Sequence, residues 1–260
     1  VAADDGAQFD VVVTNPVGTL TSQSAVLTVQ ALPPAGARVS TGLVVFYPFN
    51  EAGGALVTDQ SNVGLPMDLG ISGGVTWNPS GNGVVMSGGS GTVASLGSGS
   101  KVIDALQLTN TSTFEAWIEP VDLKWVAPII SIDSGSSSIN MGMEQKKNDM
   151  EIRLLHTTKK SGNKPQLQTG DDPLSLTLTH IVHTYDGTVE KLYIDGVQNP
   201  TTVVRSGTYA NWEVTDSFSV GNLATLDKGW KGTMRLVAVY DRPLTVAEIQ
   251  QNFAAGPTGQ

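Results

Sequence analysis

The stretch Ser112-Thr-Phe-Glu-Ala-Trp-Ile-Glu119 carries an aromatic ring between two carboxylates. Because side chains alternate along a strand, Glu115, Trp117 and Glu119 share one face, and the apolar side chains between them share the other and belong in a core. Two such acids are a start toward the general acid and nucleophile of a glycoside hydrolase, which need opposing carboxyl groups at short separation. Residues two apart on a strand point the same way, so we expect no catalytic pair here.

Other catalytic and metal-binding patterns are missing from the sequence. Asp149 and Glu151 are the nearest approach to an acid-rich strand, and they lack a third acid. There is no cysteine nucleophile or Ser-His-Asp elbow, and the run Ser87-Gly-Gly-Ser-Gly-Thr92 lacks the ending of a phosphate-binding loop. His180 and His183 are three apart on a predicted strand, so they point to opposite faces and do not share a metal ion. We expect neither an enzyme nor a zinc or iron site.

Most of the tryptophans lie in turn-like sequence, where they are candidates for sugar stacking. The C–H face of a sugar ring lies well on an exposed indole, while polar groups nearby satisfy the hydroxyls. We predict Trp125, Trp212 and Trp230 as stacking surfaces, with Arg153 and Glu115 as hydrogen-bonding groups on open strand faces. The alternative for each tryptophan is that it packs a loop onto the body of the protein.

Composition narrows the class of protein further. The chain has 260 residues, a formal net charge of −9 and no cysteine. Nucleic-acid binding draws on clustered Lys and Arg, and the lysine pairs Lys146-Lys147 and Lys159-Lys160 lie in polar loop-like sequence. No apolar run approaches the length of a membrane-spanning helix. We therefore expect neither nucleic acid nor a membrane as a partner, while the lack of cysteine is compatible with secretion and with a cytoplasm.

The stretch from Leu178 to Gly196 predicts a β-hairpin. Two alternating runs meet at Tyr185-Asp186-Gly187, and the second run ends at Asp195-Gly196. Asp-Gly pairs tolerate the positive φ of tight hairpin turns. The hairpin predicts a β-protein with one buried and one solvated face.

Short strands and one helix are expected in the rest of the chain. The strands are predicted at Leu43–Phe49, Gly83–Met86, Ser112–Glu119, Ala127–Ile132, Ser138–Met143, Met150–His156, Thr201–Arg205, Ser217–Gly221 and Thr233–Tyr240. Many short strands separated by Gly, Ser, Asn and Asp clusters predict a sandwich. The one convincing helix is Leu244–Phe253, where Thr245 is suited to be the N-cap and Glu248 follows three residues later.

The hairpin resembles the signature of laminin-G-like, concanavalin A-like jelly-roll domains of secreted bacterial proteins, in which an alternating strand, Tyr185-Asp-Gly187 and Tyr193-Ile-Asp-Gly196 follow in order. The closing segment Gly232–Leu244 and the helix after it are also similar to that family. The resemblance implies an all-β, antiparallel jelly-roll β-sandwich with one short C-terminal helix over residues 42–256.

The first 30 residues form two alternating runs around Asn15-Pro-Val-Gly18. They resemble the last two strands of a bacterial immunoglobulin-like domain, with Phe9 where that family usually has Tyr. Two strands do not make a sandwich, and an isolated hairpin is marginal in water. We therefore interpret residues 1–30 as a fragment of a longer multidomain protein and the proline-containing residues 31–41 as a linker.

The jelly-roll resemblance also points to calcium. Such modules often fix an early loop with an oxygen-ligated ion, and Asn50, Glu51 and Asp59, together with Asn62, supply hard ligands there. Where relatives usually have Asp in the closing strand, this chain has Arg235, which is suited to pair with Glu51 or Asp59. A structural calcium ion and a salt bridge are the two alternatives for this loop.

The resemblance and the tryptophans together lead to an expected function. We expect a non-catalytic carbohydrate-binding module that anchors a larger secreted or cell-surface bacterial protein to a polysaccharide, with other domains of the same parent chain as neighbours. One alternative is a structural or adhesive domain that contacts a protein partner. The other is a sandwich-fold glycoside hydrolase or lyase, which requires acids converging in one cleft.

Overall fold

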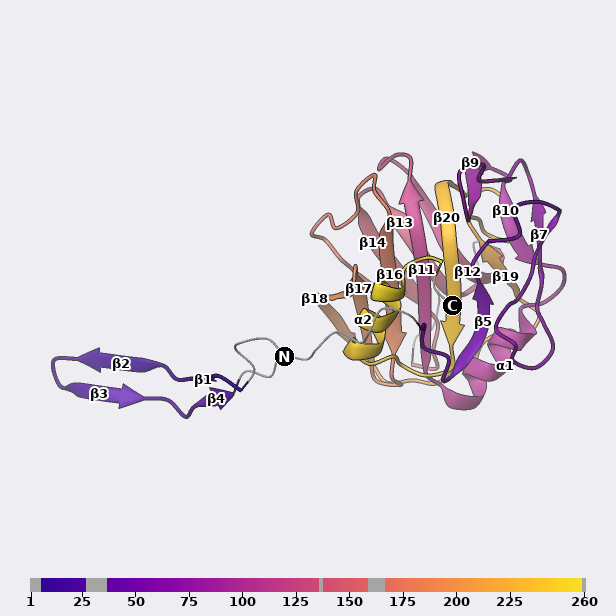
Figure 1. The fold of residues 1–260 in the computed structure, drawn as a ribbon. Helices are drawn as coiled ribbons and strands as arrows, with labels where there is room; N and C mark the ends of the chain where they lie inside the picture. Colours follow the sequence, from indigo (N-terminus) through magenta and orange to yellow (C-terminus); the bar gives the residue numbers. More distant parts are fainter. Residues whose placement is uncertain (1–5, 27–36, 136–137, 159–166, 259–260) are drawn as a thin grey trace.

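The computed structural model describes residues 6–26, 37–135, 138–158 and 167–258. Most of the predicted linker and the Lys159-Lys160 pair lie outside the described residues. Two antiparallel sheets stack face to face in the described part of residues 37–258 (Figure 1). This arrangement confirms the predicted antiparallel β-sandwich.

One sheet, called the β12 sheet, has the strand order β15-β14-β13-β12-β19-β10-β7-β6. Its strands are β6 (Leu56–Val57), β7 (Leu69–Ser72), β10 (Thr92–Ser95), β12 (Val126–Gly135), β13 (Ser138–Lys146), β14 (Asp149–Leu154), β15 (Leu167–Gln168) and β19 (Ser217–Val220). The other, called the β11 sheet, has the order β18-β17-β16-β11-β20-β9-β8, with β5 also beside β20. Its strands are β5 (Leu43–Tyr47), β8 (Thr76–Trp77), β9 (Val84–Gly89), β11 (Ser112–Pro120), β16 (Thr179–Tyr185), β17 (Val189–Ile194), β18 (Val197–Val204) and β20 (Gly229–Tyr240).

The alternation in the sequence decides which side chains fill the sandwich. Phe114, Ala116 and Ile118 of β11 point inward and meet the apolar faces of β12, β13 and β14, so the main core lies between the sheets. The predicted hairpin is formed by β16 and β17, and the turn after β17 has positive φ at Asp195 (48°) and Gly196 (77°). The period of two in the sequence therefore predicted correctly which side chains of β11 face the main core.

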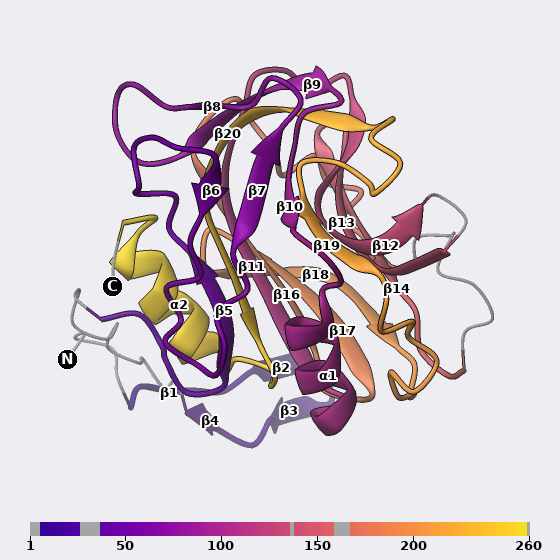
Figure 2. The same cartoon turned by 90° about the vertical axis from the view of Figure 1, so that its right-hand side faces the viewer.

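A second apolar cluster lies on the outer face of the β11 sheet, under helix α2 (Val246–Ala255). Trp117, Leu236 and Tyr240 of the sheet pack there against Ile249 of α2. The predicted cap is present, because the Thr245 side chain accepts a hydrogen bond from the Glu248 amide and Glu248 reaches back to the Thr245 amide. Figure 2 shows α2 on the outer side of the sandwich.

The described chain also contains a helix that the sequence did not predict, α1 (Ser100–Thr109). Its N-cap residue is Gly99, no side chain caps its first turn, and that turn holds no acid. The usual start signals of a helix are thus absent. Val102, Ile103 and Leu106 bury one stripe of α1 against the sandwich, so tertiary packing stabilises it.

The N-terminal segment forms a separate pair of short ladders, β1 (Gln8–Phe9) with β4 (Ala25–Val26) and β2 (Val12–Asn15) with β3 (Gly18–Thr21). Every residue in these strands is exposed. The two predicted runs around Asn15-Pro-Val-Gly18 are present as strands. Among the described residues of the whole chain, no helix is long and apolar enough to cross a membrane.

Candidate functional site

Trp125 is the one tryptophan of the predicted set that lies open to solvent, with 47% of its surface exposed. It ends the loop between β11 and β12. The indole N–H donates to Asp122 Oδ2 at 2.7 Å, and Lys231 Nζ lies 4.0 Å from the centroid of the ring. A hydrogen bond at the ring edge and a cation over the ring both restrict the side chain. Trp125 is thus an exposed aromatic surface held in a defined orientation.

The loop that carries Trp125 rests on buried groups from two other strands. Gln145 of β13 donates from Nε2 to the carbonyl oxygens of Asp122 and Lys147, both at 2.9 Å, and it accepts from the Trp230 indole N–H at 2.6 Å. The Lys147 amide donates to the Trp125 carbonyl at 2.8 Å. Since Gln145 and Trp230 are each 1% exposed, the support is rigid protein interior.

Three lysines lie near Trp125 in the fold. Lys231 Nζ lies over one face of the ring, the Lys147 backbone amide donates to the Trp125 backbone carbonyl, and Lys124 is the preceding residue. We call the group of Asp122, Lys124, Trp125, Lys147 and Lys231 the Trp125 edge. It comes from three segments that are distant in sequence, so sequence spacing gave no sign of it.

Two other predicted stacking residues are buried, which corrects that part of the prediction. Trp212 is 4% exposed, donates its N–H to the Leu155 carbonyl at 2.6 Å and packs with Tyr209 at 4.3 Å between ring centroids. Trp230 is the second residue of β20, and its ring lies across Gly232, whose φ is 154°. A Cβ at Gly232 would lie 2.3 Å from the Trp230 ring, so glycine is required for this packing. Both tryptophans stabilise the fold and offer no face to a sugar.

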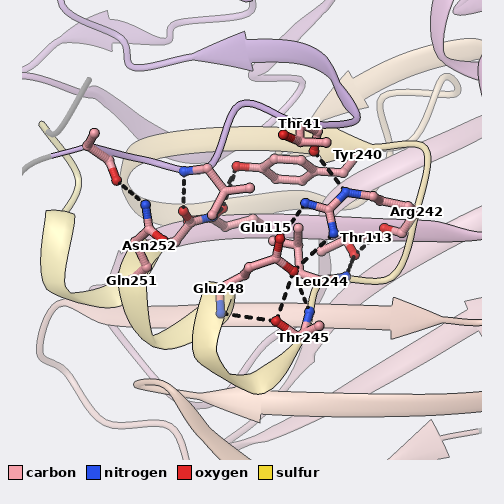
Figure 3. A network of polar contacts seen from close by, with 12 residues as sticks. Thr41, Thr113, Glu115, Tyr240, Arg242, Leu244, Thr245, Glu248, Gln251 and Asn252 are labelled. Atoms are coloured by element: carbon pink, nitrogen blue, oxygen red, sulfur yellow. Dashed lines mark hydrogen bonds and ion pairs between the residues drawn. The ribbon is translucent and has the colours of Figure 1, made fainter. Parts of the chain in front are cut away.

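Glu115 was predicted on an open strand face, and this prediction is wrong. Its side chain is 0% exposed, because α2 and the chain just before β5 cover it (Figure 3). It forms an ion pair with Arg38, accepts from Asn252 Nδ2 at 2.8 Å and contacts His180 Nε2 at 2.9 Å. The group is therefore a structural centre of the fold.

The environment of Glu115 fixes its charge. Burial acts to raise the pKa of this carboxyl group, but the Arg38 charge and the His180 contact outweigh it and lower the pKa to about 2. Trp117 lies beside this network, stacked on His180 at 4.7 Å and on Phe253 at 5.7 Å between centroids. Aromatic packing and ionic contacts together attach α2 to the sheet.

Arg153, the last predicted binding residue, points to the outer face of the β12 sheet. Its Nε lies 2.9 Å from Glu144 Oε1 and its Nη2 lies 3.9 Å from Glu151 Oε2. Glu144 and Glu151 are direct cross-strand neighbours, and Lys146 also pairs with Glu151. Sequence reasoning missed this pair of acids because they lie on adjacent strands. Each carboxylate is paired with a basic side chain.

The predicted calcium ligands have protein partners. Glu51 accepts from the amide and hydroxyl of Thr58, each at 2.7 Å, and Asn50 binds Gln60. Asp59 Oδ2 accepts from Lys101 Nζ at 2.6 Å. Within the described ranges, no three His, Cys, Asp or Glu side chains form a group that could hold a metal ion.

Lys101 provides the cation in this loop. Its ammonium also donates to the Val63 carbonyl at 2.6 Å and lies 3.4 Å from Ser61 Oγ. Arg235, the cation that the sequence suggested, instead binds Glu119 at 2.9 Å and the Asn82 carbonyl at 2.6 Å. A salt bridge does form at Asp59, but from α1, the helix that the sequence did not predict.

Solved structures with a similar fold include two different kinds of protein. A Trypanosoma rangeli sialidase in complex with 2,3-difluoro-KDN matches 83% of this chain and 33% of its own, at 19% identity and a TM-score of 0.59. The receptor binding domain of botulinum neurotoxin C/D mosaic serotype matches 84% of this chain and 52% of its own, at 14% identity and a TM-score of 0.60. The chain therefore spans about a third of the sialidase. These identities establish the fold alone.

The sialidase matches correct one expectation from the sequence. We expected that the chain is not an enzyme, yet several of the similar solved structures are those of an enzyme. The fold is thus no argument against catalysis, and the similarity assigns no reaction to this chain.

Sequence comparison gives the family. No curated protein sequence matches the chain significantly. The family model of the concanavalin A-like lectin/glucanases superfamily, of the laminin-G type, matches residues 87–250, which is more than half of the chain and includes α1, most of both sheets and Trp125. With the stacked antiparallel sheets and the capped C-terminal helix, this match identifies the chain as a member of the concanavalin A-like lectin/glucanases superfamily.

Proposed function

We propose that this sandwich binds glycans through the Trp125 edge and thereby holds a larger secreted or surface protein on a polysaccharide. The observation that carries the proposal is the exposure of Trp125 on a buried support. An indole with 47% of its surface in water has apolar surface that a ligand would bury favourably. A ring held in a fixed orientation is suited to stack on the C–H face of a sugar.

Rigidity of the support strengthens the proposal. Asp122 and Lys231 hold the indole, and Gln145 and Trp230 hold the loop beneath it. A ring that is already ordered costs little conformational entropy when a ligand stacks on it. Membership in a superfamily that includes lectins, and the carbohydrate analogue named in the similar sialidase complex, are consistent with a glycan ligand.

A second candidate function is contact with a protein partner, and a different surface favours it. A groove of about 500 Å³ lies between residues 63–67 and α1, lined by Val63, Leu65, Pro66 and Ala105 among others. Leu65 is 87% exposed. Exposed apolar surface of this kind is common at protein interfaces.

The two functions are separated by matched variants. Trp125→Ala is compared with Leu65→Ala in pull-down and array experiments on plant, algal and fungal polysaccharides. We expect Trp125→Ala to abolish binding in a protein that still folds, and Leu65→Ala to leave glycan binding unchanged.

Two outcomes would contradict the proposal, and a third would extend it. Glycan binding that survives Trp125→Ala would move the site elsewhere, and no binding across the panel would favour the protein-contact function. Soluble sugar released from a bound polymer would add glycoside cleavage, and Glu144→Gln and Glu151→Gln would then be tested in that assay.

A further inference from the structure

Among the described residues, the lysines of the Trp125 edge lack an acidic partner, in a chain with few basic groups. The formal net charge is −9, so basic groups are scarce. Six of the twelve described basic side chains have an acidic partner: Arg38 with Glu115, Lys101 with Asp59, Lys146 with Glu151, Arg153 with Glu144, Arg235 with Glu119 and Arg242 with Glu248. Within the described residues, Lys124, Lys147 and Lys231 take part in no ion pair.

The acid at this edge does not neutralise these lysines. Asp122 Oδ2 accepts from the Trp125 indole, and Asp122 Oδ1 accepts from the Lys124 amide at 2.9 Å. Its two oxygens therefore have backbone and ring partners, and none of the three ammonium groups binds them. The neighbouring acid Glu119 is paired with Arg235. In the part of the chain that the structure describes, the edge therefore carries three lysines without an acidic partner, one of them over the exposed aromatic ring and two on the neighbouring backbone.

We infer that the Trp125 edge recognises an anionic glycan, in which a sugar ring stacks on the indole and a carboxylate or sulfate substituent pairs with Lys124, Lys147 and Lys231. The inference rests on the proposed function and names the substrate class. A neutral sugar offers only hydroxyl oxygens to the ammonium groups, whereas the hydrogen bonds that an anionic substituent forms with them join opposite charges and are stronger.

The choice of lysine narrows the chemistry further. An ammonium group is a compact point charge with three rotatable donors, whereas arginine offers a planar fork that fits bidentate carboxylates. Lysines at the Trp125 edge therefore favour a negative charge without requiring one anion geometry. A carboxylate and a sulfate group both meet this requirement. The chain's overall negative charge repels polyanions at long range, so recognition is local and salt-sensitive.

The experiment compares charged and neutral forms of the same polymers. Binding of a polygalacturonate oligosaccharide is measured against its carboxyl-reduced counterpart, and dextran sulfate is measured against dextran, so that the two anionic groups are distinguished. We expect at least one charged form to bind about ten-fold or more tightly than its neutral partner, and we expect raising the salt from about 0.1 M to about 1 M to remove the difference.

Matched lysine variants locate the charge. Lys124→Gln and Lys147→Gln do not touch the Trp125 ring face, so they are expected to lower affinity for the charged polymer several-fold and leave the neutral polymer unaffected. Lys191→Gln, on β17 in the other part of the β11 sheet, is the control and is expected to change neither. Circular dichroism confirms that each variant is folded.

The outcomes separate this inference from the proposed function. Equal binding of charged and neutral polymers, lost in Trp125→Ala, would overturn the anionic preference and leave glycan binding in place. Absence of all glycan binding would contradict both the anionic preference and the proposed function. An equal loss of affinity for the charged polymer in Lys191→Gln would show a nonspecific charge effect. If single-stranded DNA bound as tightly as the charged polymer, and this binding was lost in Trp125→Ala, the edge would not select glycans.

Discussion

The guanidinium of Arg38 forms a buried ion pair with the carboxylate of Glu115, which lies in the middle of the β11 sheet. Their side chains are 4% and 0% exposed. Arg38 precedes the first strand of the sandwich, so this pair fastens the incoming chain to the central strand. Val39 and Ala37 add two backbone contacts to α2 through Asn252 and Gln251.

Removal of one partner of this pair is expected to be far more damaging than removal of an exposed pair. Arg38→Met leaves Glu115 buried without its main counter-charge, and we expect a loss of about 3 to 5 kcal/mol in the free energy of unfolding. Arg242→Met is the control, since Arg242 and Glu248 are about a quarter exposed and such a pair contributes about 1 kcal/mol or less. Urea unfolding measures both, and an equal loss in the two variants would contradict the buried-charge argument.

Glu115 is also expected to make the fold acid-sensitive. Its pKa is about 2 in the folded protein against an ordinary value of 4.5, so its contribution is complete above about pH 4.5 and is lost as the pH falls toward 2. The shift corresponds to about 3 kcal/mol. Urea unfolding from pH 7 down to pH 2.5 is expected to show a smaller pH dependence for Arg38→Met/Glu115→Gln than for the wild type.

Asp216 is expected to act in the opposite direction. Burial, and then the negative charges of Asp133 and Glu213, raise the pKa of Asp216 to about 6 from 3.8. The folded state is therefore penalised as the pH rises above 3.8, and the penalty is complete above 6. Asp216→Asn is expected to stabilise the protein at pH 7 by about 1 to 2 kcal/mol and to have little effect at pH 3. The control is Asp104→Asn at an exposed position, which is expected to have little effect at either pH. A destabilised Asp216→Asn at pH 7 would contradict this account.

Lys101→Ala is expected to give the loop around Asp59 a new requirement for calcium. The variant leaves Asp59 and the Val63 carbonyl without the ammonium that binds both, and these oxygens are hard ligands. Thermal melting with calcium and with chelator is expected to give separate midpoints for Lys101→Ala and coincident ones for the wild type. A melting temperature of Lys101→Ala that is the same with calcium and with chelator would show that the loop oxygens do not form a calcium site.

Replacement of a buried tryptophan is expected to lower the free energy of unfolding much more than replacement of the exposed Trp125. Trp230→Ala removes a ring that is 1% exposed and is expected to cost about 3 to 5 kcal/mol, whereas Trp125→Ala is expected to cost less than about 1 kcal/mol. Chemical denaturation of the two variants at neutral pH tests this. A large loss in Trp125→Ala would mean that the residue is part of the loop's core.

The sequence predicted strands better than surfaces, and the physical reason is visible in particular residues. The presence of a strand and the faces of its side chains follow from a local period of two, which is why β11, β16 and β17 agree with prediction, whereas β20 begins at Gly229, four residues before its predicted start. Exposure depends on partners that are distant in sequence. Trp230 follows Lys228-Gly229 and resembles a loop residue, yet Gln145, 85 residues away, accepts from its indole inside the protein.

The same limit applies to Glu115 and to α1. Alternation correctly put Glu115 opposite the main core, but it contains no information that α2 and Arg38 would cover that face. Helix α1 lacks the capping signals that made α2 predictable, and its apolar stripe is ordered by the sandwich. The Trp125 edge is assembled from three segments, so Trp125 and the adjacent Lys124 were visible in the sequence, whereas their proximity to Lys147 and Lys231 was not.

The position of Arg38 has a mechanical consequence. Its Nη2 donates to the Gly256 carbonyl at 2.6 Å, so the backbone that enters the sandwich at residue 37 and the backbone that leaves it after α2 are adjacent. Tension applied between residues 37 and 256 would act first on this short contact and on the turns of α2, and through the Arg38–Glu115 pair on the central strand β11. A tether pulled at both ends would therefore load the Arg38 contact first.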